Sequence, residues 1–364
     1  MTLQLLITPR PVPRSPDREA ATPDAPACAF HRSMAGYAPS ELRDSPELAE
    51  LMKVGRVWLK IESERFGLPS FKILGASWAA ERLLAGRDED ERLCLLTATD
   101  GNHGHAVARI ARMRGLRSRI LVPRGTAKAR IEAIVTEGAQ VEVVDGDYDD
   151  AVRRAAELAD AEHILLSDTA WPGYEDVPSW VVEGYGTMFA EASEQLGGTL
   201  PDLALIPIGV GSLATAAARH WPGTNPRLVG FEPADAACAF RSIQAGAPVV
   251  VPGPHRSIMA GLNCGELALH AWPALRSRYD AFCTIGDELA EKGMGLLAQL
   301  GIAPGEVSGG AVGCALALSR DQDARRDLGI TSGSSFLLLL TEGVTNPQAA
   351  ITAQDDLPGP PSRP

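Results

Sequence analysis

Strand-like and helix-like segments alternate through the middle of the chain, and this alternation limits the possible fold more than any other feature. Short apolar runs predict buried strands, and longer stretches with helical periodicity predict helices. In order, they are strand 93–97, helix 105–113, strand 119–122, helix 127–137, strand 141–144, helix 149–158 and strand 163–166. Such a series predicts a parallel sheet covered by helices on both faces. The expected fold class is therefore α/β.

A second set of alternating segments flanks the first and predicts a second open, mostly parallel sheet. Its members are strands 56–61, 203–208, 227–231 and 336–340, with helices 71–84, 181–195, 213–220, 287–300 and 311–319. Outside both sets, residues 1–27 and 347–364 are rich in proline and lack apolar periodicity. Both ends are therefore predicted to be mobile tails.

Composition and charge argue against two classes of partner. The 364 residues carry a net charge of −12 with a pI near 5.1, whereas a protein that binds nucleic acid needs a basic surface. No apolar run reaches the roughly 18 residues that cross a bilayer. Residues 3–7 are too short for a signal-peptide core, so a cytoplasmic protein without a membrane partner is expected. The six cysteines form no C-x-x-C pair, and no metal site is predicted.

One lysine lies in an apolar segment, where a solvated charge is unexpected. Lys72 follows Phe71 and precedes Ile73 and Leu74. Burial disfavours the ammonium form, and the neutral amine is a nucleophile toward an aldehyde. The alternative is a helix lysine whose stem packs while its head reaches water. For the lysine taken alone that alternative is favoured, and three further segments reverse the preference.

These three segments each follow a predicted buried strand and carry polar residues or glycine. They are Thr97-Ala-Thr-Asp-Gly-Asn-His-Gly104, the stretch 202–213 that runs into Gly209-Val-Gly211, and 336–343, where the strand ends at Thr341. Open α/β sheets bind ligands at the carboxyl ends of their strands. Asp100 and Asn102 therefore fall at a binding edge. Alternatively, Asp100 caps the next helix and Asn102 stabilises the turn.

The glycine-rich segment Gly209-Val-Gly-Ser-Leu-Ala214 is compatible with two kinds of ligand. It fits the G-x-G-x-x-A pattern of dinucleotide-binding folds, and Glu232 ends the next strand where a ribose-binding acid would lie. That interpretation leaves Lys72, Asp100 and Asn102 without a role. Backbone N–H groups at a helix start also bind a single phosphate. A phosphate-bearing cofactor gives all these residues a role and is the favoured interpretation.

Together these segments resemble the fold-type II pyridoxal-phosphate (PLP) enzymes, the threonine dehydratase and tryptophan synthase β group, and among them the diaminopropionate ammonia-lyase family. The resemblance is carried by 66–72, 98–104, 168–174, 209–211, 258–266 and 341–343. The pair Ala98-Thr-Asp-Gly-Asn-His-Gly104 and Asp168-Thr-Ala-Trp171 is its most specific part. The resemblance implies a small domain at 85–170, inserted into a large PLP-binding domain at 28–84 and 171–346. It also implies a homodimer.

The resemblance also implies which residues hold the cofactor. Lys72 would bind PLP covalently and later act as an acid or base, with Phe71 beside it. Asn102 would donate a hydrogen bond to the ring oxygen of PLP, and Thr341 would face its ring nitrogen. The phosphate would be held by the backbone amides of Gly209, Val210, Gly211, Ser212 and Leu213.

Two aspartates narrow the expected activity. Asp100 and Asp168 match residues that, in the ammonia-lyases, transfer protons and handle the second amine of the substrate. A β-ammonium needs such carboxylates, whereas a dehydratase of hydroxy amino acids does not. The expected reaction is α,β-elimination of ammonia from the small amino acid 2,3-diaminopropionate, giving pyruvate and ammonia. Elimination or replacement on another β-substituted amino acid, and a catalytically silent PLP-binding protein, are the alternatives.

The sequence also departs from the family in places. Val307 precedes Ser-Gly where the family has an acidic residue, and Asn263 and Leu267 differ around Cys264-Gly-Glu266. The ammonia-lyases can carry a cysteine pair near the active-site entrance, in segments that here contain Cys238 and Cys264. A disulfide between the two and a pair of separate thiols are both open, although disulfides are rare in the cytosol.

Overall fold

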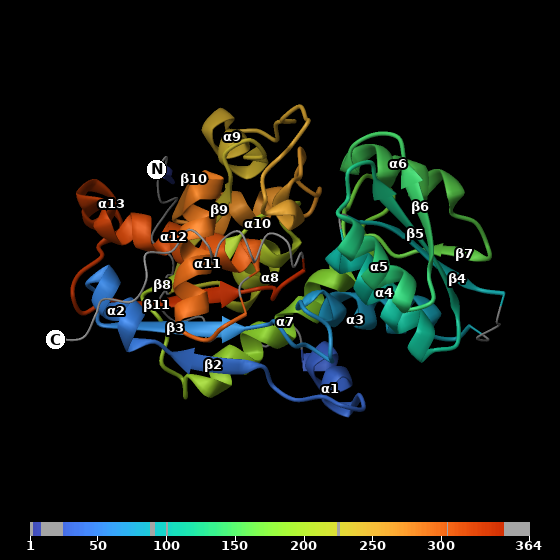
Figure 1. Cartoon of the computed structure of the whole chain (residues 1–364), viewed down its shortest axis with the longest axis horizontal. Coiled ribbons are helices and arrows are strands. Elements are labelled where there is room, and N and C mark those ends of the chain that lie inside the picture. Colours follow the sequence, from blue (N-terminus) through green and yellow to red (C-terminus); the bar gives the residue numbers. More distant parts are fainter. Residues whose placement is uncertain are drawn as a thin grey trace.

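Two sheets form two lobes that lie side by side (Figure 1). The computed structural model describes residues 3–8, 25–87, 92–99, 101–223, 226–303 and 305–345. The smaller sheet has the order β6-β5-β4-β7, and all of its pairs are parallel. Its strands are β4 (Cys94–Ala98), β5 (Arg117–Pro123), β6 (Gln140–Val144) and β7 (His163–Leu165). The predicted α/β class with two mostly parallel sheets is confirmed.

The larger sheet has the order β1-β10-β9-β8-β11-β3-β2. Its strands are β1 (Leu3–Ile7), β2 (Glu41–Asp44), β3 (Arg56–Ile61), β8 (Leu203–Pro207), β9 (Arg227–Pro233), β10 (Ala281–Ile285) and β11 (Ser335–Leu340). The five inner strands pair in parallel, and the two edge strands pair antiparallel. Every residue of β8 and β10 is buried, as expected of parallel strands with helices on both faces.

The helices cover both sheets, and some of them lie between the lobes. They are α1 (Ala25–Ser33), α2 (Pro46–Met52), α3 (Lys72–Leu84), α4 (Asn102–Met113), α5 (Lys128–Thr136), α6 (Tyr148–Leu158), α7 (Asp176–Gln195), α8 (Ser212–His220), α9 (Cys238–Ala245), α10 (Ala271–Arg278), α11 (Asp287–Gln299), α12 (Glu306–Arg320) and α13 (Gln322–Leu328). In Figure 1, α3 and α7 lie where the lobes meet, and α4 to α6 surround the smaller sheet. No helix in the described ranges is long and apolar enough to cross a membrane.

The start of α12 lies five residues before the predicted helix start at 311, and glycines explain the difference. Glycine weakens a helix prediction because it has low helix propensity. Here it allows close packing of α12 against α11: a Cβ at Gly309 would lie 2.4 Å from Ala290 O, and one at Gly313 would lie 1.9 Å from Leu289 O. Tertiary packing therefore overrides local propensity at this point.

The prediction of a mobile tail over residues 1–27 is wrong for two segments. Leu3–Ile7 is strand β1, paired antiparallel with β10, and α1 begins at Ala25. The apolar residues of β1 gain cross-strand contacts and backbone hydrogen bonds only because β10 offers an open edge. The local sequence carried no sign of that partner. Residues 9–24 and the predicted tail 347–364 lie outside the described residues.

Candidate active site

A pocket between the lobes collects strand ends from both sheets. Lys72 begins α3, Asn102 begins α4, Asp168 follows β7, and Thr341 follows β11. The space between protein atoms, counted out to the open mouth, is about 680 Å³. Of the residues singled out in the sequence, those that line it are Phe71, Lys72, Asn102, Asp168, Gly209, Val210, Gly211, Ser212, Leu213, Cys264, Val307 and Thr341. The pocket therefore lies at the ligand-binding edge expected of an α/β sheet.

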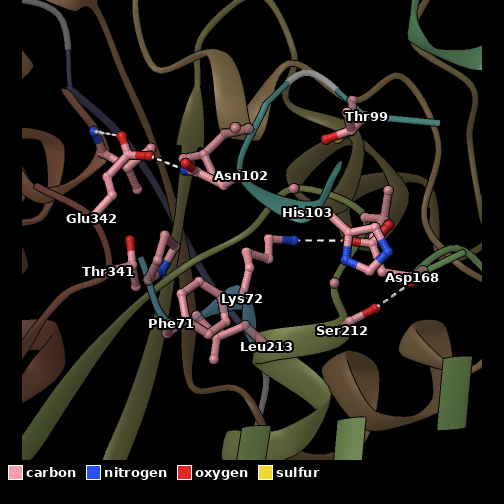
Figure 2. A pocket seen from close by; sticks show the side chains of 18 of the residues that line it. Phe71, Lys72, Thr99, Asn102, His103, Asp168, Ser212, Leu213, Thr341 and Glu342 are labelled. Carbon is pink, nitrogen blue, oxygen red and sulfur yellow. Dashed lines mark hydrogen bonds and ion pairs between the residues drawn. The ribbon is translucent and has the colours of Figure 1, made fainter. Parts of the chain in front are cut away.

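Lys72 points across this pocket to Asp168. Its Nζ atom lies 2.7 Å from Asp168 Oδ2 (Figure 2). The lysine side chain is 21% exposed because it borders the open pocket, whereas the aspartate side chain is 5% exposed. The ring centroids of Phe71 and Tyr185 lie 5.7 and 5.8 Å from Nζ, within the range of cation–π contacts. The ammonium group is therefore held by a carboxylate and two aromatic rings.

Asp168 remains ionised although it is buried. Burial alone would raise the pKa of its carboxyl group, but the Lys72 ammonium, His103 and Tyr148 together hold that pKa well below its usual range. Tyr148 Oη donates to Asp168 Oδ1 at 3.3 Å, and His103 Nδ1 lies 3.9 Å from Oδ2. A cationic group that enters the pocket would therefore meet a fixed negative charge.

His103 and Tyr148 were not assigned to the site from the sequence. His103 is 2% exposed, and its Nε2 donates to the carbonyl of Leu166 at 2.9 Å. With Nε2 held by Leu166, the other ring nitrogen, Nδ1, faces Asp168. His103 could have been found, because it lies in the same motif as Asn102. Tyr148 gave no local signal, since only the folded chain brings the start of α6 to the end of β7.

Asp100 lies outside the described residues, so its predicted place beside Asp168 is not described. Its neighbours Thr99 and Gly101 are. Thr99 Oγ1 accepts hydrogen bonds from the backbone N–H groups of Gly101 and Gly104, at 2.9 and 3.0 Å. The Thr99 hydroxyl thus stabilises the start of α4, a role for which the sequence had offered Asp100 as a candidate.

The loop from Gly209 to Leu213 forms a cradle at the start of α8. Gly211 has a φ of +97°, and a Cβ there would lie 2.6 Å from the Cβ of Ala271. A Cβ at Gly209 would lie 3.0 Å from Gly261 O. Gly211 therefore requires glycine and Gly209 leaves little room for a side chain, so the loop presents its backbone amides rather than side chains to a ligand. The helix dipole and these amides favour an anion, which suits the phosphate of PLP.

Glu232, the candidate ribose-binding acid, has a different role. It is fully buried, and its two carboxylate oxygens accept the backbone N–H groups of Ala239 and Phe240, both at 2.7 Å. Burial raises the pKa of Glu232 to about 8. The carboxyl group therefore binds the start of α9 and is not among the residues that line the pocket, which removes the main support for a dinucleotide site.

The end of β11 supplies the side of the pocket opposite Asp168. Thr341 is 3% exposed, and its carbonyl accepts the N–H of Phe71 at 3.3 Å. Asn102 Nδ2 donates to Glu342 Oε2 at 2.5 Å (Figure 2). Burial and the nearby carboxyl of Glu306 raise the pKa of Glu342, while Arg130 opposes them. Glu342 was noted in the sequence only as part of the Thr-Glu-Gly segment.

The cysteine pair near the pocket consists of thiols, so the disulfide alternative is wrong for this structure. Cys238 Sγ lies 3.7 Å from the carbonyl of Gly209, and Cys264 lines the pocket. Burial raises the pKa of Cys238 well above its ordinary value, with a further contribution from Glu232. Such a buried thiol behaves as a small apolar group rather than as a nucleophile.

The two-lobed fold, the pocket lysine and the anion cradle define the class of protein: a PLP-dependent enzyme of fold type II. The family model described as pyridoxal-phosphate dependent enzyme matches residues 34–342. The residues present fit the cofactor, because the Lys72 amine and the glycine cradle open into the same pocket.

Individual relatives narrow this class. A diaminopropionate ammonia-lyase from Salmonella typhimurium is 36% identical over 88% of both chains. The crystal structure of diaminopropionate ammonia-lyase from Escherichia coli with an aminoacrylate-PLP azomethine reaction intermediate superposes with a TM-score of 0.89, covering 97% of each chain at 31% identity. A second structure of that enzyme, in complex with D-serine, gives 0.88 at 30% identity and covers 97% of each chain. The chain belongs to the diaminopropionate ammonia-lyase family.

Proposed function

We propose that the protein catalyses the α,β-elimination of ammonia from 2,3-diaminopropionate. The α-proton and the β-ammonium leave the substrate, and the unsaturated amino acid that is released reacts with water. One diaminopropionate and one water thus give one pyruvate and two ammonia molecules. The observation that carries the proposal is the ion pair of Lys72 with the buried Asp168, 2.7 Å apart, in a chain whose relatives bear this activity by name.

The cofactor would be held by the residues predicted from the sequence. Lys72 would bind it through the side-chain nitrogen, with Phe71 packed beside the lysine stem. The cradle amides from Gly209 to Leu213 would take its phosphate, Asn102 its ring oxygen and Thr341 its ring nitrogen. When bound to the substrate amine, PLP withdraws electrons from the α-carbon. A neutral threonine hydroxyl at the ring nitrogen does not force its protonation, which suits elimination.

Lys72 and Asp168 would divide the proton chemistry. Lys72 Nζ faces the pocket, so once released from the cofactor it can take the α-proton. Asp168 holds a negative charge at 2.7 Å from Nζ and would bind the β-ammonium of the substrate. Asp100 would join Asp168 in this role. The β-amine can leave as neutral ammonia only from its ammonium form, so the carboxylates would also favour that protonated form.

The test measures products and their ratio. Purified protein with 2,3-diaminopropionate should form pyruvate and ammonia in a ratio of one to two. Lys72→Ala should form both at least about 10²-fold more slowly. Asp176→Asn, at an exposed aspartate in the first turn of α7, serves as a matched control and should retain full activity. Turnover of serine or O-acetylserine with none of diaminopropionate would instead establish one of the other eliminations.

Three further expectations join this proposal. Residues 28–84 and 171–346 would form the large domain and 85–170 the small one, which agrees with the division of strands between the two sheets. The protein would act in the cytoplasm as a homodimer, by analogy with the family. Light scattering that gives a monomer at micromolar concentration would refute the dimer.

A further inference from the structure

Glu342 bonds through its side chain to both lobes at once. One oxygen, Oε2, accepts from Asn102 Nδ2 at 2.5 Å, and the other, Oε1, accepts from the Val307 N–H at 3.1 Å (Figure 2). Asn102 starts α4, which packs on the smaller sheet, whereas Val307 lies at the start of α12, which packs on the larger. The carboxyl group is 3% exposed, so water does not compete for either bond.

The position of Glu342 is fixed by its backbone rather than by Asn102. Its N–H and carbonyl both bond to Ser308 Oγ, at 3.2 and 2.6 Å. Ser70, in the turn that leads into Lys72, forms an antiparallel bridge with it. A Cβ at Gly305 would lie 2.6 Å from Glu342 O, so glycine lets α12 approach this closely. Glu342 is therefore a fixed point against which the Asn102 amide is aligned.

The consequence for Asn102 follows from the chemistry of its amide. An asparagine can turn either its NH₂ or its oxygen toward a ligand, and the two presentations are opposite in hydrogen-bonding character. Both Glu342 oxygens act as acceptors, so Nδ2 is drawn to Oε2. One N–H of Nδ2 is then used by Glu342, and the second is left for a ligand in the pocket that Asn102 lines.

We infer that Glu342 is a positioning residue, which orients the Asn102 amide so that it offers an N–H to the ring oxygen of PLP. The inference rests on the proposed role of Asn102. Glu342 itself would not touch the reacting atoms. Because it belongs to the large sheet and Asn102 to the small one, it would also set the position of the two lobes on either side of the cofactor.

A double-mutant cycle on cofactor affinity tests the inference. The dissociation constant of PLP is measured by titrating cofactor-free protein with Glu342→Gln, Glu342→Ala, Asn102→Ala and both double variants. Glutamine has one acceptor for two N–H donors, so even this isosteric change should weaken PLP binding, by about 10-fold. In the Asn102→Ala background the same change should cost less than about twofold, because the amide it positions is gone.

Three results would overturn the inference. Equal losses with and without Asn102 would mean that Glu342 acts by another route. An unchanged affinity in Glu342→Gln would mean that the amide needs no alignment. An unchanged affinity in Asn102→Ala would remove the proposed role of Asn102 as well, while the product assay with diaminopropionate still judges the reaction separately. If Glu342→Ala fails to fold, the glutamine arm of the cycle decides.

Glu306→Gln separates alignment from the electrostatic effect of a buried carboxylate. Glu306 is 3% exposed, raises the pKa of Glu342 and makes no hydrogen bond to Asn102 among those described. If alignment is the cause, Glu306→Gln should change PLP affinity by less than about twofold. The Glu342 variants, unlike Glu306→Gln, should also shift the visible absorbance of the bound cofactor, because the ring oxygen loses its N–H partner. An equal shift in Glu306→Gln would contradict the inference.

Discussion

The two sides of the pocket each carry a buried carboxyl group, and the two groups behave in opposite ways. Asp168 and Glu342 are both 3% exposed. Asp168 lies beside the Lys72 ammonium, and its pKa is held below the usual range despite burial. Glu342 has amide N–H donors and the nearby carboxyl of Glu306, and its pKa is raised by burial and by that neighbour.

This difference shows that the partner, not the depth of burial, determines what a buried carboxyl group does. A full cation within 2.7 Å offsets desolvation and leaves a permanent negative charge on one side of the pocket. Two neutral N–H donors satisfy the oxygens but supply less electrostatic compensation. The Asp168 side is therefore suited to binding and moving charge, and the Glu342 side to alignment.

Removing the Lys72 ammonium group should have the largest effect on the rate of elimination. Lys72→Ala deletes the partner of Asp168 and the amine that holds the cofactor, so elimination should fall by roughly 10²–10⁴-fold from the proton-transfer role alone. Borohydride reduction of the wild-type protein with PLP, followed by mass spectrometry, should place the reduced cofactor on Lys72. Recovery of the adduct on another lysine would refute the assignment of Lys72 as the cofactor-binding residue. It would also remove the basis for the contrast between the Asp168 and Glu342 sides of the pocket.

Removing the charge of Asp168 should have the next largest effect. Asp168→Asn keeps the size of the side chain and loses a charged hydrogen bond, worth about 1.5–3 kcal/mol or about 10- to 150-fold in kcat/KM. A further loss follows if the carboxylate also moves a proton. The yellow colour of the bound cofactor should survive, because Asp168 does not hold it.

The choice of substrate sharpens this second prediction. β-Chloroalanine and O-acetylserine lack the second amine, so the penalty of Asp168→Asn should be smaller with them than with diaminopropionate. Asp100→Asn should follow the same pattern if Asp100 shares the role. Equal penalties on both kinds of substrate would mean that the carboxylates do not recognise the β-ammonium.

The sequence predicted residues on both sides of the pocket and missed residues on both, Tyr148 beside Asp168 and Glu342 beside Asn102. Lys72 and Asp168 lie in segments whose residue types are unusual for their surroundings. Strand β3 was predicted at its observed bounds, because four of its six residues are apolar. Glu342 could not be interpreted in this way, since its partners come from α4 and α12, far away in the chain. The edge strand β1 was missed for the same reason: its stability depends on β10.

The pH dependence of stability should also differ between the two sides. A carboxyl group with a raised folded pKa stabilises the fold at acid pH, and this contribution is lost as the pH rises above its unfolded pKa, about 4.3 for glutamate. Asp168 has the opposite sign, so its contribution is lost only as the pH falls below about 3.9. As the pH rises above about 4.3, Glu342→Gln should therefore flatten the decline in Tm of the cofactor-free protein, and Asp168→Asn should leave the slope unchanged. Equal slopes in both variants would refute the contrast.

A third buried carboxyl group, Glu232, gives the smallest expected effect on catalysis. Because Glu232 is buried but lies outside the pocket lining, it separates the effect of burial from the effect of contact with the pocket. Its pKa is raised from 4.5 to about 8 by burial, yet it bonds to the start of α9 and is absent from the described lining of the pocket. Because the folded pKa is raised, its stabilising contribution is lost as the pH rises from 4.5 to about 8. Glu232→Gln should flatten the Tm profile across that window. Its kcat/KM for diaminopropionate should stay within about twofold of wild type, since Glu232 does not line the pocket and makes no interaction specific to the transition state. A tenfold loss of kcat/KM in a folded Glu232→Gln variant would show that a buried carboxyl group affects the reaction without contacting the pocket. The distinction drawn between Asp168 and Glu342 from their partners would then fail.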